Sequence, residues 1–210
     1  STTHRVGLRR LMARLADKYP ANDVVPAEIE HRLLEHLDPM VLEPKTILDA
    51  GAGTGRTVKL LRGRYPSANV IALDLSTQML RHARGRWPWR NRARVCGDHG
   101  ALPIKTASVD LIVSNLGLGE GTMGDPERSL AEFARVLAPG GLLLFATLGP
   151  DSFKELAHAW LATDETVTLP PLVDMHDLGD ALTRHGFAGV VVDAEKIQVT
   201  FPAIGDLFAE

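Results

Sequence analysis

The sequence holds one cysteine, Cys96, in 210 residues, and it has no long apolar run. A single cysteine cannot build a disulfide framework or a cysteine-based metal site, so we expect a reducing, cytoplasmic setting and no metal. No stretch reaches the length of a membrane span and no signal-peptide pattern is visible, so we expect no membrane partner. The chain also has no internal repeats and no low-complexity segment.

Charge of one sign is not in excess either, because the formal net charge is only −3. The whole molecule is therefore unlike a general nucleic-acid-binding protein. The length and the 45% hydrophobic content suit one well-buried core, and we expect a single domain over residues 1–210. The chain starts without methionine and stops at Glu210 inside a helical pattern, which is consistent with truncation of the C-terminal part, residues 151–210.

The most informative feature that is present is a glycine-rich turn. A strand-like run at residues 45–48 leads into Asp49, and alternating glycines follow at Gly51, Gly53 and Gly55. Glycine lets a ligand lie against the backbone, and the helix predicted after the turn offers free N–H groups and a positive dipole end. The pattern predicts a nucleotide site, although an ordinary strand-to-helix turn remains possible on this motif alone.

The spacing of the glycines separates two kinds of nucleotide site. A dinucleotide fingerprint has its third glycine three residues after the second, and Arg56 occupies that position here. An acid just before glycines at 51, 53 and 55 instead resembles the first motif of class I S-adenosylmethionine-dependent methyltransferases.

A second acid follows at a suggestive distance. The apolar run at residues 68–73 ends at Asp74, nineteen residues beyond Gly55. A carboxylate at the tip of a second parallel strand can accept both hydroxyls of a ribose. The alternative is a helix N-cap, a role that Ser76 could fill alone.

Strands and helices alternate along the chain, which predicts a parallel sheet covered on both faces. We expect helices near 8–18, 27–37, 55–64, 76–84, 126–137, 152–161 and 174–185 and strands near 46–49, 69–74, 93–96, 109–115 and 142–147. Residues 189–193 and 195–200 are predicted to add an antiparallel hairpin, making seven strands. The fold class is therefore α/β.

Two further loops follow strands of this predicted sheet. Asp98 could accept a hydrogen bond from the amine of an adenine or could only shape a turn, and we expect His99 to be a loop residue and not a base. Asn115 ends the fourth strand. It could lie beside the reactive sulfonium of a bound S-adenosylmethionine, or it could have no role beyond ending the strand. No Ser-His-Asp or paired-carboxylate arrangement is evident, so no catalytic residue is assigned from the pattern.

A basic segment runs from Arg81 to Arg94, with six arginines and two tryptophans in fourteen residues. Such runs are usually solvated. The segment could instead dock an acidic protein, and nucleic acid is a weaker third option.

Residues 46–147 look like the class I methyltransferase core, which has a Rossmann-like fold, and residues 148–182 are similar to the malonyl-carrier-protein O-methyltransferases of biotin synthesis. The stretches 148–151, 154–156, 159–160 and 174–182 carry the second resemblance, and the helix ending at Tyr19 resembles that family's lid. The implied organisation is a helical lid at 1–40, a cofactor-binding core at 45–150 and a C-terminal part.

That resemblance implies methyl transfer from S-adenosylmethionine to a malonyl carboxylate on acyl carrier protein, leaving S-adenosylhomocysteine. The carboxylate is already ionised, so no general base is needed. The acidic carrier protein would be a partner for the arginine segment. The implied cofactor-binding residues are Asp49, Gly51, Gly53, Gly55, Asp74, Leu75, Asp98, His99 and Asn115, with Tyr19 and Asn115 near the methyl group.

Two alternatives stay open. Residues 195–202 also resemble a branch that contains respiratory complex I assembly factors, some of which are described as arginine hydroxylases, so the substrate could be a protein side chain. A cofactor-binding module without catalysis is the other alternative.

Overall fold

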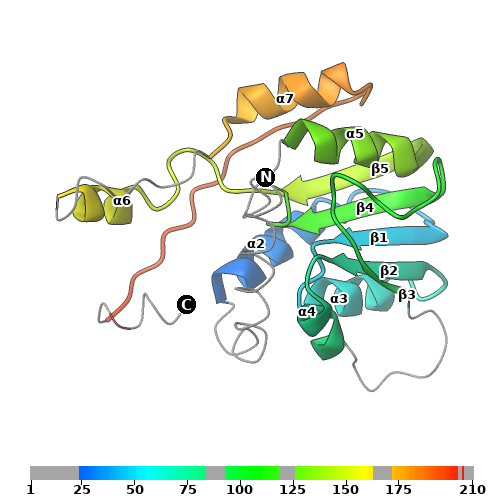
Figure 1. Cartoon of the computed structure of the whole chain (residues 1–210), viewed down its shortest axis with the longest axis horizontal. Helices are drawn as coiled ribbons and strands as arrows, with labels where there is room; N and C mark the ends of the chain where they lie inside the picture. The colour runs from blue at the N-terminus through cyan, green and yellow to red at the C-terminus, as the bar shows by residue number, and fades with distance from the viewer. Residues whose placement is uncertain (1–23, 84–92, 119–125, 163–171, 203–204, 206–210) are drawn as a thin grey trace. The chain divides into compact units, whose positions relative to one another are not determined.

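The computed structural model describes residues 24–83, 93–118, 126–162, 172–202 and 205. Within them helices and strands alternate as predicted (Figure 1). The helices are α2 (Val24–Glu35), α3 (Arg56–Arg64), α4 (Thr77–His82), α5 (Pro126–Val136), α6 (Lys154–Leu161) and α7 (Met175–Arg184). The strands are β1 (Thr46–Ala50), β2 (Asn69–Asp74), β3 (Ala93–Cys96), β4 (Val109–Asn115) and β5 (Leu137–Ala146).

The described strands form one sheet in the order β3-β2-β1-β4-β5, and every neighbouring pair is parallel. This confirms the predicted α/β class and the parallel sheet. The chain builds outward from β1 to β3 and then crosses back to β4, so the strand order reverses beside β1. In open α/β sheets, ligands bind at the carboxyl ends of the strands at such a reversal.

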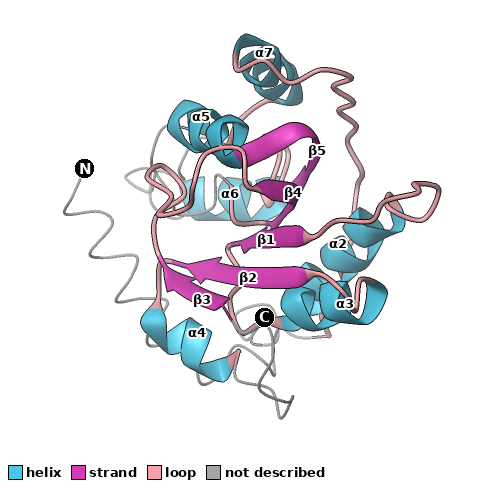
Figure 2. Cartoon of the chain, turned by 90° about the vertical axis from the view of Figure 1, so that its right-hand side faces the viewer, coloured by secondary structure: helices cyan, strands magenta, loops and turns pink. Residues whose placement is uncertain are grey.

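Helices cover both faces of this sheet. Leu33 of α2, Val58 of α3 and Leu80 of α4 share one apolar cluster with Ile47 and Val113 of the sheet. Because side chains alternate across a strand, the residues next to Ile47 and Val113 point to the other face. Fully buried side chains of α5, such as Phe133, lie outside that cluster, and α5 lies on the side of the sheet away from α2 and α3 (Figure 2).

The predicted seven strands and C-terminal hairpin are not confirmed. Residues 187–202 are described and contain no strand, so the described sheet has five. The valine-rich run had suggested a strand, but β-propensity reflects fit to a half-buried pleated surface more than a preference of the backbone itself. Val191 is 90% exposed, so this segment has no such surface to fit.

The last sheet strand also differs from expectation. We expected residues 142–147, but β5 begins at Leu137, which pairs with Val109, and the register shifts before Leu142 pairs with Leu111. Gly140 and Gly141, which lie between the predicted helix and the predicted strand, are therefore an irregular part of β5.

The chain divides into two compact units. One contains residues 1–147 and 197–210 and holds the sheet, and the other is Leu148–Lys196 and holds α6 and α7. In the second unit α7 begins at an N-cap, because the Asp174 side chain accepts a hydrogen bond from the N–H of His176.

Candidate functional site

The predicted glycine turn lies at the carboxyl end of β1, and its three glycines have positive φ angles of 90°, 51° and 86°. At Gly51 two features require glycine: the positive φ angle, and the space beside it, since a Cβ there would lie 2.9 Å from the Cα of Gly117. The backbone N–H groups of Gly51 and Ala52 both donate to the carbonyl of Leu73, at 2.9 Å each. The turn is thus held between the ends of β2 and β4, and α3 starts directly after it.

Asp74, at the end of β2, is tied to the same turn. Its Oδ2 accepts from the N–H of Gly53 at 2.9 Å, and its Oδ1 accepts from the N–H of Ser76 at 2.7 Å. Burial raises the pKa of Asp74, and the two N–H groups oppose that rise. Each oxygen keeps a second lone-pair direction that could accept a ligand hydroxyl.

Ser76, not Asp74, is the N-cap of α4. Its side chain accepts from the N–H of Met79 at 3.3 Å. The alternative role considered for Asp74 is thereby assigned to its neighbour, and the carboxylate stays at the end of the strand.

Asp49 is the most unusual group of the site. Its side chain is buried, with the residue 1% exposed, and neither carboxylate oxygen has a hydrogen-bond partner. Burial raises its pKa well above the usual value, and the charges of Glu30 and Asp74 add to the rise, while the nearby N–H of Val58 opposes it. An unpaired buried carboxylate costs free energy in the unliganded protein, and a positive ligand group would remove that cost.

Glu30 was not predicted, yet it brings a third carboxylate close to this turn. It lies on α2, is 2% exposed, accepts from Arg56 Nε at 2.6 Å and also accepts from the hydroxyl of Thr57. The sequence did contain a signal, because Glu30 has the helical spacing of the buried Leu33 and Leu37. An acid on the apolar face of a helix indicates a buried polar partner.

The loop after β3 presents Asp98 and His99. Asp98 Oδ1 accepts from the N–H of Gly100 at 2.9 Å, so the turn role is present. His99 is buried and its ring lies against Phe133, with 5.7 Å between ring centroids. Burial lowers its pKa to about 4, against contributions from Asp98 and the Gly117 backbone, so the ring is neutral at neutral pH. Its Nδ1 is buried without a hydrogen bond.

Asn115 joins the end of β4 to α2. Its Nδ2 donates to the carbonyl of Pro26 at 3.0 Å, and its Oδ1 is buried with no partner. The preceding Ser114 donates to the carbonyl of Ala50 at 2.7 Å, which ties β4 to the start of the glycine turn. The ends of β1, β2 and β4 are therefore linked through polar contacts.

Of the other predicted residues, Leu75 follows Asp74 and its carbonyl accepts from the thiol of Cys96 at 3.5 Å. Tyr19 and most of the arginine segment, residues 84–92, lie outside the described residues. Arg81 and Arg94, at the ends of that segment, are exposed. Among the described residues no group of three or more His, Cys, Asp or Glu is placed to hold a metal ion. None of the described helices is long and apolar enough to cross a membrane.

Comparison with known proteins gives three findings. Residues 47–141 match the family model described as a methyltransferase domain. Malonyl-(acyl-carrier protein) O-methyltransferases of Laribacter hongkongensis and a Methylovorus species are 40% and 39% identical, over 96% and 92% of this chain and 70% and 67% of theirs. A SAM-dependent methyltransferase of Thermotoga maritima, described as a possible histamine N-methyltransferase, shares the fold with a TM-score of 0.63 at 22% identity, over 85% of this chain and 81% of that one.

Proposed function

Because this chain belongs to the malonyl-(acyl-carrier protein) O-methyltransferase family, we propose that it methylates the free carboxylate of a malonyl group on acyl carrier protein in biotin synthesis. The methyl donor is S-adenosylmethionine, which supplies a methyl group on a positively charged sulfur. In the transfer the carbon–sulfur bond breaks, its electron pair stays on sulfur and the methyl carbon bonds to a carboxylate oxygen. The observation that carries the proposal is the buried, unpartnered carboxylate of Asp49 at the end of β1, directly before the glycine turn.

The described residues fit this donor. Asp49 offers two unused acceptors at a backbone that glycine keeps open, which suits the ammonium of the methionyl part. Asp74 has lone pairs left for the ribose hydroxyls, and we assign Asp98 and His99, on the loop after β3, to the adenine. Leu75 and Asn115 flank the same strand ends.

The proposed chemistry needs no base. A malonyl carboxylate is ionised at neutral pH, and His99, with a pKa of about 4, is a buried neutral ring that does not compete for protons there. A positive sulfur and a negative carboxylate become two neutral groups as methyl is transferred. Orienting the two in a site that excludes water is then the main task of the protein.

We propose residues 45–150 as the cofactor-binding core, residues 1–40 as a helical lid and residues 151–210 as the C-terminal part of one methyltransferase domain. The first compact unit reaches Thr147, close to the proposed end of the core. The hydrogen bond from Asn115 to Pro26 supports a lid contact, since it joins the N-terminal region to the end of β4. A cytoplasmic location suits a chain with one cysteine.

The acidic carrier protein is the proposed partner of the segment from Arg81 to Arg94. Charge reversal at Arg84, Arg86 and Arg90 together should raise KM for the carrier protein at least about tenfold and leave the affinity for S-adenosylmethionine unchanged, because complementary charge mainly assists encounter. Unchanged KM would remove the docking role from this segment.

Calorimetric titration of S-adenosylmethionine and S-adenosylhomocysteine tests the proposed cofactor site first. We expect micromolar binding that falls at least about a hundredfold in Asp74→Ala, because that variant loses the acceptor and frees the N–H of Gly53. Incubation with malonyl-carrier protein should then add one methyl group to its mass. A folded protein that binds neither ligand would refute the proposal, and one that binds donor but never methylates the carrier would refute the acceptor.

A further inference from the structure

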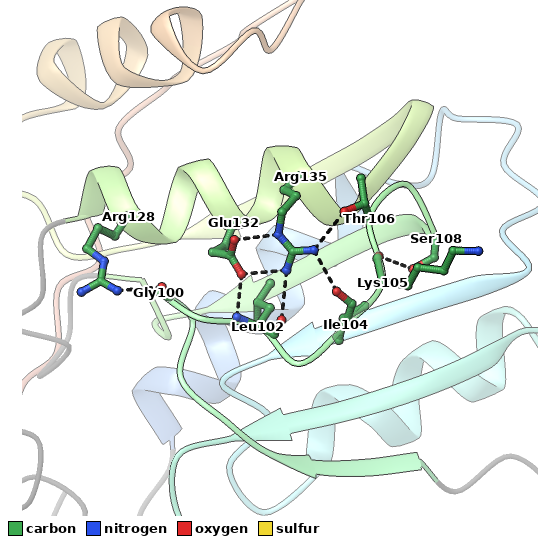
Figure 3. A network of polar contacts seen from close by, with 9 residues as sticks. All are labelled: Gly100, Leu102, Ile104, Lys105, Thr106, Ser108, Arg128, Glu132 and Arg135. Atoms are coloured by element: carbon green, nitrogen blue, oxygen red, sulfur yellow. Dashed lines mark hydrogen bonds and ion pairs between the residues drawn. The ribbon is translucent and has the colours of Figure 1, made fainter.

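One face of α5 holds the segment that follows His99 (Figure 3). Arg128 Nη2 donates to the carbonyl of Gly100 at 3.2 Å, and Glu132 Oε2 accepts from the N–H of Leu102 at 2.7 Å. Phe133, on the same helix, contacts the ring of His99. The helix therefore touches this segment at residues 99, 100 and 102, immediately after Asp98.

Arg135 is the centre of this contact. Its Nη2 donates to the carbonyl of Leu102 at 3.0 Å, and its Nη1 donates to the carbonyl of Ile104 at 2.9 Å and to Thr106 Oγ1 at 3.2 Å. Its Nε and Nη2 also donate to the two oxygens of Glu132, at 2.7 and 2.8 Å. A guanidinium has five N–H donors, and these five contacts use all of them.

A side chain with every donor engaged inside the protein has none left for a substrate. Arg135 is also one-third exposed, so burial of its charge is not what holds it in place. Its role is instead to join three points of a loop to one helix. Glu132 strengthens this by accepting from both Arg135 and the loop, and these contacts lower the pKa of Glu132 and raise that of Arg135.

The same loop is fixed from its other end by β2. The N–H of Gly97 donates to the carbonyl of Asp74 at 3.1 Å, and Pro103 packs on Gly97 so closely that a Cβ there would lie 3.1 Å from the proline ring. Asp98 and His99 are thus held between β2 on one side and α5 on the other. The Asp98 carboxylate also accepts from the N–H of Gly100, so loss of either support would let this carboxylate shift together with the turn that carries it.

We propose that Arg135, aided by Glu132, is a positioning residue for base recognition, which holds Asp98 where it distinguishes an amino group from a carbonyl on the purine ring. The inference rests on the proposed role of Asp98 at the adenine. An adenine amine can donate to the carboxylate, whereas the carbonyl of hypoxanthine at the same ring position would face it with a second acceptor. A site built to accept a hydrogen bond rejects an analogue that lacks the N–H group, provided that the accepting carboxylate cannot move aside.

Calorimetric titration with S-adenosylhomocysteine and S-inosylhomocysteine measures this directly as a ratio of the two dissociation constants. For the original protein we expect a ratio of at least about fifty in favour of adenine. Arg135→Ala should reduce the ratio at least about fivefold, mainly by weakening the binding of S-adenosylhomocysteine. Arg135→Lys should not restore it, because an ammonium has three donors and no fork to reach Leu102, Ile104 and Glu132 together.

The matched control is Arg64→Ala, since Arg64 Nη1 also pairs with a carboxylate, that of Asp38, at 2.6 Å on the surface of α3. It should leave the ratio unchanged. A general loss of stability would lower the affinity for both ligands alike and leave the ratio of dissociation constants unchanged. Thermal melts run in parallel therefore separate a loss of stability from a loss of base recognition. If Arg135→Ala does not fold, Arg135→Lys and Glu132→Gln decide, with a lower ratio expected in both.

Two results would overturn the inference, and only the second would also overturn the proposed role of Asp98 at the adenine. A ratio that stays at the original value in folded Arg135 variants would overturn the positioning role alone. An original protein that binds both ligands equally well would overturn the adenine role of Asp98 and the inference with it.

Discussion

Three carboxylates near the glycine turn differ in what satisfies them. Glu30 is matched by Arg56 and Thr57, Asp74 accepts two backbone N–H groups, and Asp49 has no hydrogen-bond partner. Asp49 therefore carries most of the unrelieved negative charge. This is where a positively charged donor would gain the most on binding.

Replacement of Asp49 by asparagine should stabilise the free protein and weaken donor binding. Because the pKa of Asp49 is raised on folding, the folded state holds its proton more tightly, and ionisation at neutral pH lowers stability. We expect Asp49→Asn to raise Tm by about 2–4 °C near pH 7. The same substitution should lower the affinity for S-adenosylmethionine at least about tenfold. Thermal melts and calorimetry measure the two, and a lower Tm with unchanged affinity would contradict the assignment.

Two glycines of the turn make a matched pair. An alanine at Gly51 would meet Gly117 at 2.9 Å in a left-handed conformation, whereas at Gly53 it would meet no atom within 4 Å. Gly53→Ala should cost about 1 kcal/mol from the backbone conformation alone, and Gly51→Ala about 2–3 kcal/mol because a clash is added. Urea denaturation gives both values, and equal losses would show that the contact with Gly117 can relax.

At the scale of elements, α2 is attached to the site by polar contacts at two points. Pro26 accepts from Asn115 of β4, and Glu30 accepts from the first two residues of α3. A helix that precedes the sheet in sequence is thereby joined to the turn that would bind the donor. Its packing and the geometry of the turn should respond together to mutation.

Glu30→Ala tests this attachment, with Glu28→Ala as its control on the same helix. Removing Glu30 takes away the buried carboxylate to which Arg56 and Thr57 both donate, which should lower the free energy of unfolding by about 3 kcal/mol. Glu28 pairs with Arg32 at 2.8 Å, and the two side chains are 44% and 40% exposed, so its loss should change stability by less than about 0.5 kcal/mol. Chemical denaturation distinguishes them, and similar small effects would mean that Arg56 finds other partners.

Elements with strong periodic patterns were predictable, and those that depend on distant partners were not. β4 was expected as a continuous apolar strand at 109–115, and α3 was expected directly after the glycines. The valines at 190–192 had the same local character but form no strand, since strand formation needs a neighbour that the sequence does not specify. Arg135 lies in the helix predicted near 126–137, yet three of its five contacts are with a loop about thirty residues earlier, which no local pattern specifies.

At the scale of the whole molecule, His99 makes stability depend on pH. Its pKa falls from 6.5 to about 4 on folding, so between these values the unfolded chain binds a proton that the folded chain does not. Stability from this group is present above about pH 6.5 and is lost as pH falls toward 4. The loss is on the order of 3 kcal/mol.

We expect His99→Gln to flatten this dependence. Urea midpoints near pH 7 and near pH 4.5 should fall less on acidification in the variant than in the original protein. The comparison cancels the opposite contributions of Asp49 and Asp74, whose raised pKa values favour the folded state in acid. Parallel curves for the two proteins would show that folding does not lower the pKa of the His99 ring.

The single cysteine makes the proposed site addressable by chemistry. Cys96 is exposed, ends β3 and pairs in register with Asp74 of β2. A thiol-reactive fluorophore would therefore attach at one position, next to the carboxylate proposed for the ribose. Its emission would report on occupancy in real time, and no cysteine would first have to be removed or introduced.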